Sequence, residues 1–399
     1  MSARVRARWL GEPGVARVMA ALAVGGRPAR FVGGCVRDAL LDPGADTPDL
    51  DLATPERPEQ VMQLLAAAGL KPLPTGLRHG TVSVVRWQRR FEITTLRRDV
   101  ATDGRHAVVE FTDDFDADAA RRDFTINAMS CEVDGTLHDP MGGRADLAAG
   151  RVRFVGEPAR RIAEDYLRIL RFFRFHARFG QGEPDPAALA ACAAAAAGID
   201  GLSGERVRQE LWLILAQAEP LRALAPMAAT GVLDRVLPGP VRPEALRREV
   251  LGADSLLRLA ALLRPSSAAR VDALADRLRL SNQERERLAA LVTTPLPEGG
   301  DREQRRALHR LGADRYRDLV RLDLAAGRLA AEAGQHRLAL AERWDAPAFP
   351  LTGADLLALG VPEGRELGRI LAQIRAAWEE SDFALDRAAC LALARDLTP

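Results

Sequence analysis

Two aspartates that alternate with leucines are the residues of this sequence best suited to chemistry. Asp49 and Asp51 stand in the run Asp-Leu-Asp-Leu. Because side chains alternate in a β-strand, this run places both carboxylates on one face, about 6.6 Å apart, and both leucines on the other. Carboxylates at this spacing can bind divalent cations, as in-line phosphoryl transfer with two metal ions requires. A solvated strand face is the alternative interpretation.

A third carboxylate follows in the run Phe-Glu-Ile-Thr-Thr-Leu. Glu92 alternates there with Thr94 on the polar face of a predicted strand. Residues 81–85, Thr-Val-Ser-Val-Val, predict a neighbouring strand. A hairpin between the two strands would place Glu92 beside the aspartates and strengthen the metal interpretation.

Two adjacent glycines precede the aspartates. Gly33 and Gly34 end a predicted strand and begin a helix that contains Arg37. Glycines let the backbone approach a ligand closely, and the N-terminus of a helix attracts an anion. Arg37 lies about one turn into the helix, where its guanidinium could reach the same anion. Phosphate is the natural ligand, although an ordinary turn with positive φ also explains the glycines.

The segment at 121–129, RRDFTINAM, combines charged and apolar residues. It predicts a short helix with Asp123 as its N-cap and the apolar residues as its buried face. This structural interpretation does not account for the two arginines or for Asn127.

Residues 160–179, RRIAEDYLRILRFFRFHARF, predict one amphipathic helix. Asp165, Arg168 and Arg171 fall near one stripe of this helix. Six arginines against two acidic residues are more than internal ion pairs require. The excess of positive charge favours a groove for a triphosphate or for RNA.

The spacing of Asp165 and Arg168 also suits the recognition of a base. Cytosine and adenine each present an exocyclic amine beside a ring-nitrogen acceptor, whereas uracil and guanine present a carbonyl beside an N–H. A carboxylate accepts a hydrogen bond from the amine, and a guanidinium donates one to the ring nitrogen. The pair would therefore accept C and A and leave polar groups unpaired against U and G.

These motifs together resemble a known enzyme family. GGCVRD followed by DLD, then RRDFTINAM and EDYLR, is similar to the signature of class II CCA-adding tRNA nucleotidyltransferases and bacterial poly(A) polymerases, in the DNA polymerase β-type superfamily. The resemblance implies an enzyme that adds CCA to tRNA 3′ ends from CTP and ATP, without a template, by two-metal transfer with release of pyrophosphate. It covers the N-terminal half well and the C-terminal part from Phe349 more loosely.

The resemblance also implies roles for individual residues. Asp49, Asp51 and Glu92 would be catalytic, with Asp49 and Asp51 as ligands of Mg²⁺, which prefers oxygen donors. The implied nucleotide-binding residues are Gly33, Gly34, Arg37, Arg122, Asp123, Asn127, Asp165, Arg168, Arg171 and Arg174. In the family, a flexible loop helps the switch from C to A addition, and Asp103, Gly104 and Arg105 in the polar segment at 99–107 are its candidates here.

The composition and the hydrophobic pattern of the sequence limit the folds that it can adopt. The chain has 399 residues and a net charge of +1. Its four cysteines are scattered and form no Cys-x-x-Cys pair, and this pattern predicts a cytoplasmic, reducing environment and no structural zinc. No apolar run is long enough to cross a membrane. Asp134-Gly135 within the run at 130–140, SCEVDGTLHDP, predicts a hairpin, and residues 151–156, RVRFVG, predict a further strand. Strand signals end near residue 157, so we expect an α+β fold. Its expected parts are a mixed-sheet nucleotidyltransferase head with a palm-like sheet (1–156), a helical neck and RNA-binding region (157–237), a helical body (238–300) and a helical tail (301–399).

Three alternatives remain open at the level of the sequence. One is a poly(A) polymerase, and another is an enzyme that adds only CC or only A. A strongly basic tail would favour polyadenylation, because long RNA is held largely through its phosphates, but the C-terminal stretch is near neutral. The third alternative is a non-catalytic RNA-binding regulator, which would have no need of convergent carboxylates.

Overall fold

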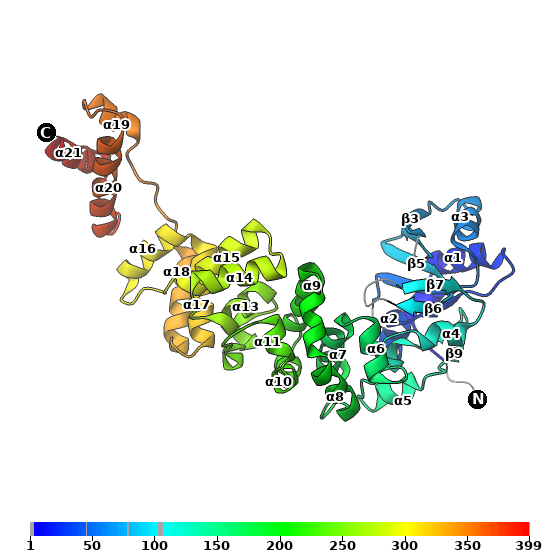
Figure 1. The fold of residues 1–399 in the computed structure, drawn as a ribbon. Helices are drawn as coiled ribbons and strands as arrows, with labels where there is room; N and C mark the ends of the chain where they lie inside the picture. Colours follow the sequence, from blue (N-terminus) through cyan, green and yellow to red (C-terminus); the bar gives the residue numbers. More distant parts are fainter. Residues whose placement is uncertain (1–3, 45, 78–79, 103–106, 399) are drawn as a thin grey trace. The chain divides into compact units, whose positions relative to one another are not determined.

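The computed structural model describes residues 4–44, 46–77, 80–102 and 107–398 (Figure 1). The chain divides into two compact units, Met1–Gly239 and Pro240–Pro399. The first contains a mixed sheet followed by helices, and the second is helical. The predicted α+β class is thereby confirmed, while the division into head, neck, body and tail stays a prediction. None of the helices in the described ranges is long and apolar enough to cross a membrane.

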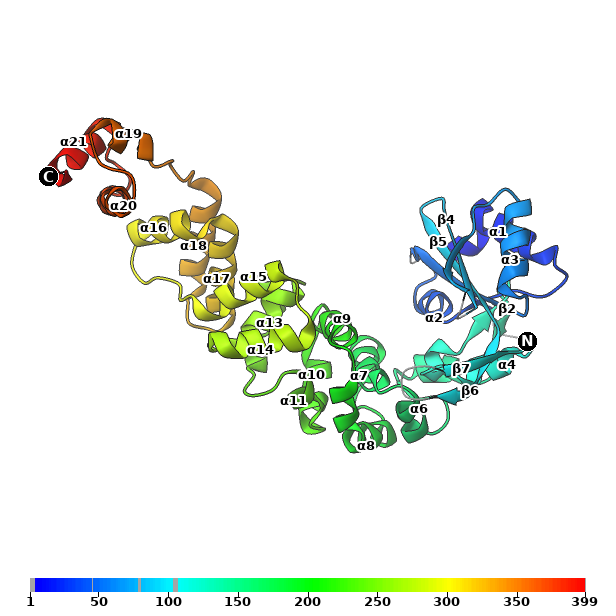
Figure 2. The same cartoon turned by 45° about the horizontal axis from the view of Figure 1, so that its top comes forward.

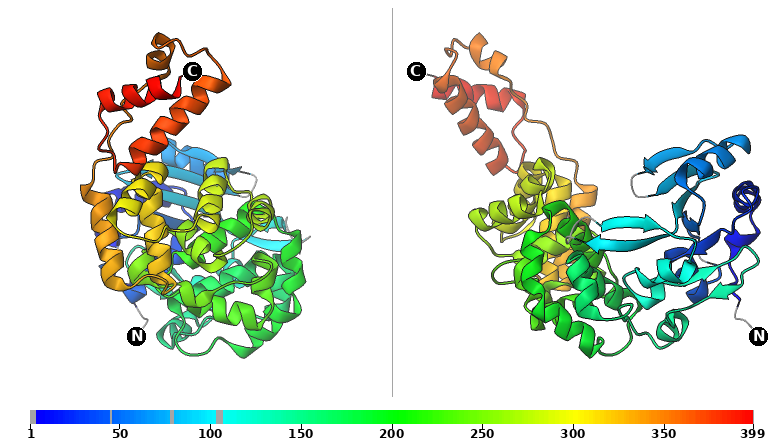
Figure 3. Two further views of the ribbon diagram at one scale, coloured as in Figure 1. Left: turned by 90° about the vertical axis from the view of Figure 1, so that its left-hand side faces the viewer. Right: turned by 45° about the vertical axis from the view of Figure 1, so that its right-hand side comes forward.

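A seven-stranded mixed sheet forms the core of the first unit. Its strands lie in the order β3-β4-β5-β2-β1-β8-β9. They are β1 (Arg30–Val32), β2 (Asp49–Thr54), β3 (Leu73–Gly76), β4 (Thr81–Arg86), β5 (Arg89–Thr95), β8 (Ser130–Cys131) and β9 (Leu137–His138). Strands β6 (Arg97–Thr102) and β7 (Ala107–Phe111) form a separate antiparallel pair, visible on the right of Figure 3.

Strand β2 lies in the middle of this sheet and pairs in parallel with β5. Leu50 and Leu52 are fully buried on one face, while Asp49 and Asp51 lie on the other. Strands β4 and β5 form the expected hairpin, whose two turn residues Trp87 and Gln88 both have positive φ, 53° and 61°. Positive φ at both positions is what a two-residue hairpin turn favours, because its twist matches that of the strands.

Short helices cover the sheet. Helix α3 (Pro58–Ala67) packs against β4 and β5, and α1 (Pro13–Ala23) packs against α3 (Figure 2). The glycine pair leads from β1 into α2 (Gly34–Leu41), which packs against β1 and β2. Further helical segments among the described residues up to 150 are η1 (Arg8–Gly11), α4 (Phe115–Ala120), η3 (Thr125–Asn127) and α5 (Gly143–Ala148).

A group of helices completes the first unit. They are α6 (Pro158–Glu164), α7 (Leu167–Phe179), α8 (Pro186–Ala194), η4 (Ala196–Gly201), α9 (Gly204–Leu215), α10 (Leu221–Ala229) and α11 (Val232–Val236). Helix α7 is central because both α9 and α10 pack against it. Phe172 and Phe175 of α7 contact Phe124, and Phe172 also stacks with Phe154. These rings join the helices to the sheet part of the same unit.

The second unit is built around a buried helix. Its described residues, 240–398, form the helical segments η5 (Pro243–Ala245), α12 (Arg248–Leu251), α13 (Ser255–Leu263), α14 (Ala268–Leu278), α15 (Asn282–Thr293), α16 (Asp301–Leu311), α17 (Ala313–Ala325), α18 (Ala331–Arg343), α19 (Gly353–Ala358), α20 (Arg365–Glu380) and α21 (Arg387–Leu397). Helix α13 is apolar nearly all round and packs against α15 and α17, as expected of a core helix. Helices α19 to α21 share a small core around Trp378 and Ile374.

Three local predictions were wrong. Residues 151–156 form no named strand, since Phe154 makes only an isolated bridge to Phe124. Asp123 is not an N-cap, because the short helix is the 3₁₀ turn η3 and its N-cap is Phe124. The segment 160–179 is two helices rather than one, interrupted at Asp165 and Tyr166. The hairpin expected at Asp134-Gly135 is present between β8 and β9.

Candidate active site

The three acidic residues singled out in the sequence, Asp49, Asp51 and Glu92, share one face of the sheet, which we call the acid face. In the parallel pairing of β2 with β5, Asp51 lies directly opposite Glu92, and Asp49 lies opposite Arg90. Neighbouring strands are about 4.8 Å apart, so Asp51 and Glu92 are cross-strand neighbours. The hairpin partner β4 contributes Ser83 beside Glu92. The sheet therefore brings the three acids to one place.

Electrostatic crowding is evident at Asp51. Burial, and then the nearby charge of Glu92, raise the pKa of Asp51 to about 6, and Arg122 opposes this effect. A bound cation would relieve the repulsion between such carboxylates. The donors are all carboxylate oxygens, which suit Mg²⁺ rather than a softer metal. The residues present therefore fit a magnesium site, with Asp49 and Asp51 as ligands.

The glycine turn brings backbone close to an arginine. Gly33 has φ +73°, and a Cβ atom there would lie 3.1 Å from Nη1 of Arg122. A side chain at Gly33 would thus be strained and would also displace the guanidinium. Gly33 and Gly34 both border the cavity described below, at the N-terminus of α2. An anion in the cavity would lie near the positive end of this helix.

Arg37 is almost fully buried, at 5% exposure, although it borders the same cavity. It donates from Nη1 to Oδ1 of Asn127 at 2.5 Å and from Nε to Asp38 at 2.8 Å. Its guanidinium also lies 4.2 Å from the ring centre of Phe179. Because its donors are largely engaged, Arg37 mainly orients Asn127 and contributes positive charge.

Asp118 holds the arginine pair that opens the segment 121–129. Arg121 donates to Oδ1 of Asp118, and Arg122 donates to Oδ2 at 3.2 Å. Burial alone would raise the pKa of Asp118, but the two guanidiniums keep it below its ordinary value. Arg122 also reaches the backbone oxygen of Asn127. The pair is thus fixed in the cavity wall with further N–H donors unused by these bonds.

Asp123 joins this segment to helix α7. Its Oδ2 atom accepts a hydrogen bond from Nε of Arg171 at 2.7 Å, and its Oδ1 atom accepts from Asn127 and from the Phe124 amide. Burial would raise the pKa of Asp123, but the pair with Arg171 and these hydrogen bonds hold it below its usual range. This ion pair explains why Asp123 does not cap a helix.

The helix break at Asp165 changes the predicted geometry of the base-reading pair. Asp165 is extended, with φ −160° and ψ 106°, and its Oδ1 atom accepts a hydrogen bond from the Leu167 amide at 3.1 Å. A side chain bonded to the backbone in this way competes with a continuous helix. Its Oδ2 atom accepts from Arg206 of α9 at 2.7 Å. Asp165 therefore does not pair with Arg168, as a single helix would have allowed.

Arg168 has partners of its own on the other side of the break. It donates to Oε2 of Glu164 at 2.5 Å and to the backbone oxygen of Arg161 at 2.8 Å. Asp165 and Arg168 both border the cavity, and their side chains bond to different partners. The carboxylate of Asp165, an acceptor, and the guanidinium of Arg168, a donor, thus border the same cavity. Arg206 orients the first, and Glu164 orients the second.

Arg171 and Arg174, both predicted to bind nucleotide, occupy different places. Arg171 borders the cavity. Arg174 does not border it, and its Nε atom donates instead to Glu210 of α9 at 2.6 Å. Arg174 therefore joins α7 to α9, and Phe175 packs against it with a centroid distance of 4.4 Å.

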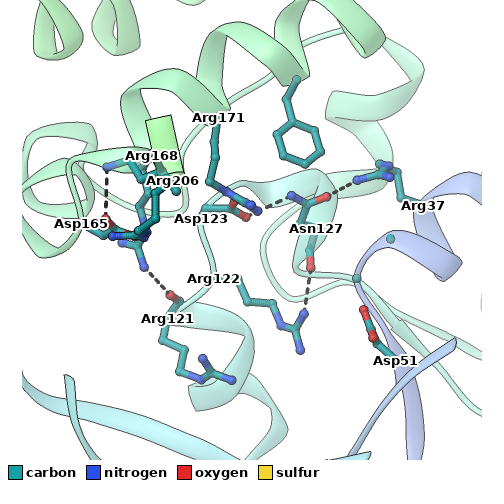
Figure 4. Close-up of a pocket in the computed structure, with 14 residues that line it drawn as sticks. Arg37, Asp51, Arg121, Arg122, Asp123, Asn127, Asp165, Arg168, Arg171 and Arg206 are labelled. Atoms are coloured by element: carbon teal, nitrogen blue, oxygen red, sulfur yellow. Dashed lines mark hydrogen bonds and ion pairs between the residues drawn. The ribbon is translucent and has the colours of Figure 1, made fainter. Parts of the chain in front are cut away.

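Many of these groups border one cavity of about 500 Å³ (Figure 4), although Asp49, Glu92 and Arg174 are not among its lining residues. Among the described residues, six arginines and three aspartates border it, so this part of its wall has an excess of positive charge. The lining residues are Gly33, Gly34, Arg37, Asp51, Arg121, Arg122, Asp123, Asn127, Asp165, Leu167, Arg168, Arg171, Phe175 and Arg206. A nucleoside triphosphate matches this cavity in size and in charge.

Sequence reasoning missed some contributors to this site. Arg121 and Arg206 border the cavity, and Glu210 anchors Arg174. Arg206 and Glu210 are one turn apart in the run GERVRQE, which is a signal for a shared helix face, but their partners lie on α7 and at the helix break before it. The loop candidates Asp103, Gly104 and Arg105 lie outside the described residues.

Comparisons with protein families identify two segments. The family described as the poly(A) polymerase head domain matches residues 29–153. The family described as the probable RNA- and SrmB-binding site of polymerase A matches residues 183–241. The first match contains the acid face and the segment 121–129, and the second contains α9.

Known proteins are similar to this chain, in sequence or in structure, over most of its length. A mitochondrial CCA tRNA nucleotidyltransferase 1 from Danio rerio is 37% identical over 373 residues, which cover 90% of this chain and 85% of the relative. The crystal structure of the Bacillus stearothermophilus CCA-adding enzyme in complex with CTP has a TM-score of 0.79 and 26% identity, and the match covers 96% of this chain and 98% of that one. A Thermotoga maritima CCA-adding enzyme complexed with tRNA, at 21% identity and a TM-score of 0.67, shares the fold over 99% of both chains.

The pair of Asp123 with Arg171 leads to a stability prediction. Asp123→Asn should lower the free energy of unfolding at pH 7 by about 2–4 kcal/mol, because it leaves a largely buried guanidinium without its main partner. The folded-state pKa of Asp123 is depressed, so the stabilisation is complete above the unfolded pKa of about 4 and disappears as pH falls through the lower folded pKa. Urea titrations at pH 7 and at pH 3 measure both effects.

Asp113→Asn provides the matched control, since Asp113 forms a largely exposed ion pair with Arg27. Its loss should cost less than about 1 kcal/mol. Equal losses in the two variants at pH 7, or an Asp123→Asn deficit that does not shrink between pH 7 and pH 3, would contradict the assignment.

Proposed function

Because the chain belongs to the family of CCA-adding tRNA nucleotidyltransferases, we propose that it adds C, C and A in turn to the 3′ ends of tRNA, with CTP and ATP as nucleotide donors. The observation that carries this proposal is the cavity that Asp51, Arg122 and Asp165 border together. One carboxylate of the acid face, several arginines for a triphosphate and a polar pair for a base all border it. No nucleic-acid template is required, because the chain itself presents the groups that select the base.

We assign the transfer step to the acid face. Asp49 and Asp51 would hold the magnesium ions, with Glu92 as the neighbouring carboxylate. Magnesium bound there would activate the 3′-hydroxyl and stabilise the negative charge of the departing pyrophosphate. The leucines on the opposite face of β2 keep the two aspartates directed to the same side.

The cavity wall supplies the binding of the triphosphate. Gly33 and Gly34 allow phosphate oxygens to approach the N-terminus of α2. Arg122 borders the same space, and its guanidinium is oriented by Asp118 and by the Asn127 backbone. Fixed donors of this kind lower the cost of ordering the nucleotide for in-line attack.

We assign base selection to Asp165 and Arg168. Each carboxylate oxygen has two lone pairs, so Asp165 can accept from an exocyclic amine while it remains bonded to Arg206. Arg168 has five N–H donors and can offer one to a ring nitrogen while Glu164 orients it. Cytosine and adenine satisfy both groups, whereas uracil and guanine leave both unpaired.

Two further points belong to the proposal. A cytoplasmic location stays a prediction, since the zebrafish relative is named as mitochondrial. A poly(A) polymerase, or an enzyme that adds only CC or only A, is the main alternative, because the matching families are described for poly(A) polymerase. The acid face argues against a non-catalytic regulator, because a protein that only binds RNA gains nothing from carboxylates that repel it.

A transfer assay tests the function. Purified protein with Mg²⁺ should add C, C and A to tRNA that lacks CCA, add only A to tRNA ending in CC, and stop at a complete CCA end. Labelled CTP and ATP, with products separated by length, give the readout. Incorporation of UTP and GTP should remain at background. Long runs of A on any RNA would establish the poly(A) alternative instead.

Substitutions at the base-reading pair test specificity. Asp165→Ala and Arg168→Ala should each reduce the preference of kcat/KM for CTP over UTP by about 5- to 150-fold, because each removes a hydrogen bond worth about 1–3 kcal/mol in discrimination. Arg178→Ala is the matched control: it removes an arginine of the same helix that pairs with Asp38 and does not border the cavity. An unchanged CTP preference in the first two variants would remove their role in selection.

A further inference from the structure

The three carboxylates of the acid face do not form a compact metal-binding group. Asp51 and Glu92 are paired in register, and Asp49 lies on the same face. Nevertheless, in the described part of the chain no group of three or more His, Cys, Asp or Glu residues is arranged to hold a metal ion. The strand pairing thus places the acids on one face, while their side chains do not by themselves form a three-residue metal site.

Arg90 lies among these acids. It lies two residues before Glu92 on the same strand, so both side chains leave the same face of the sheet. It is also directly opposite Asp49 in the neighbouring strand β2. Its Nη2 atom forms an ion pair with Oε1 of Glu92. A permanent cation therefore stands among the three acids and binds one of them.

The ion pair competes with a metal ion for Glu92. A carboxylate oxygen bonded to a guanidinium offers less negative charge to a divalent cation, and the guanidinium itself repels that cation. Arginine does not lose its proton at any ordinary pH, so only a movement of the side chain removes the competitor. Movement is feasible, because the side chains of Arg90 and Glu92 are 48% and 35% exposed. Such exposed pairs are weak, worth about 0–1 kcal/mol.

We propose that Arg90 is an internal counter-ion of the metal site, which occupies Glu92 while the site is free of metal and must be displaced when metal binds. The proposal rests on the proposed function, since it takes Asp49 and Asp51 as the metal ligands and Glu92 as the neighbouring carboxylate whose negative charge the metal ion also needs. Arg90 is a positioning residue here and touches no reacting atom.

This arrangement couples the binding of metal to the binding of nucleotide. A metal ion that arrives alone must displace Arg90 with only the carboxylates as compensation. A metal ion that arrives with a triphosphate also brings phosphate charges, which the arginines of the cavity bind. Arg90 therefore weakens metal binding more in the absence of nucleotide than in its presence. The substrate itself completes the site.

The experiment uses Mn²⁺ as the probe, with free Mn²⁺ measured by electron paramagnetic resonance on the full chain. Arg90→Gln should bind Mn²⁺ about three- to tenfold more tightly than the unaltered protein when no nucleotide is present. With a non-hydrolysable CTP analogue, the difference between the two proteins should shrink to less than about twofold. Arg90→Lys keeps the charge and should stay close to the unaltered protein.

Two controls separate the possible failures. Arg86→Gln removes an exposed arginine that pairs in register with Arg89, on the face away from the acids, and should leave Mn²⁺ affinity unchanged. The double variant Asp49→Asn, Asp51→Asn should lose the site.

If Arg90→Gln binds Mn²⁺ no more tightly than the unaltered protein, or if Arg86→Gln shows the same gain, the counter-ion proposal is overturned and the metal assignment survives. If the double aspartate variant binds Mn²⁺ as the unaltered protein does, the metal assignment of the proposed function itself fails.

Discussion

The parallel register between β2 and β5 is the constraint on which the site depends. It sets Asp51 against Glu92 and places Asp49 two residues away on the same face of β2. Leu50, Leu52 and Phe91 are buried on the opposite face, so a shift of one residue would expose them and turn the acids into the core. The hydrophobic core of the sheet and the position of the acids are thus specified by the same alternation.

A second set of contacts keeps the arginines opposite the acids. Positive charges that line one cavity repel one another, and this chain holds them in place with carboxylates behind them. Asp118 bonds Arg121 and Arg122, while Asp123 bonds Arg171 across 48 residues of sequence. These carboxylates are bonded to arginines, and arginines still outnumber aspartates among the described residues of the cavity wall. At Glu92 the roles are exchanged, because there the guanidinium of Arg90 holds a carboxylate of the acid face.

Local sequence patterns predicted part of this arrangement correctly, and long-range pairing explains the rest. The alternation at 49–52, the Asp134-Gly135 turn and the strand–glycine–helix order depend on neighbouring residues, and all three are present. The break at Asp165 was not predictable from helical periodicity, because Arg206 stabilises it from 41 residues away. Asp123 has the composition of an N-cap, but its carboxylate serves Arg171 instead. Arg174 shares the helix and charge of Arg171, and only the fold shows that it faces Glu210.

The account depends most on the acid face as the place of nucleotidyl transfer, and Asp49→Ala tests it most directly. The measurement is single-turnover addition of C from labelled CTP to tRNA lacking CCA, with tRNA binding followed in parallel. Loss of the carboxylate should slow transfer by about a thousandfold or more, because several kcal/mol of metal-dependent stabilisation disappear, while the Kd for tRNA should change by less than about threefold, because one carboxylate makes little difference to phosphate binding. Transfer within about tenfold of the unaltered rate would contradict the account, since such a loss corresponds to only about 1.4 kcal/mol.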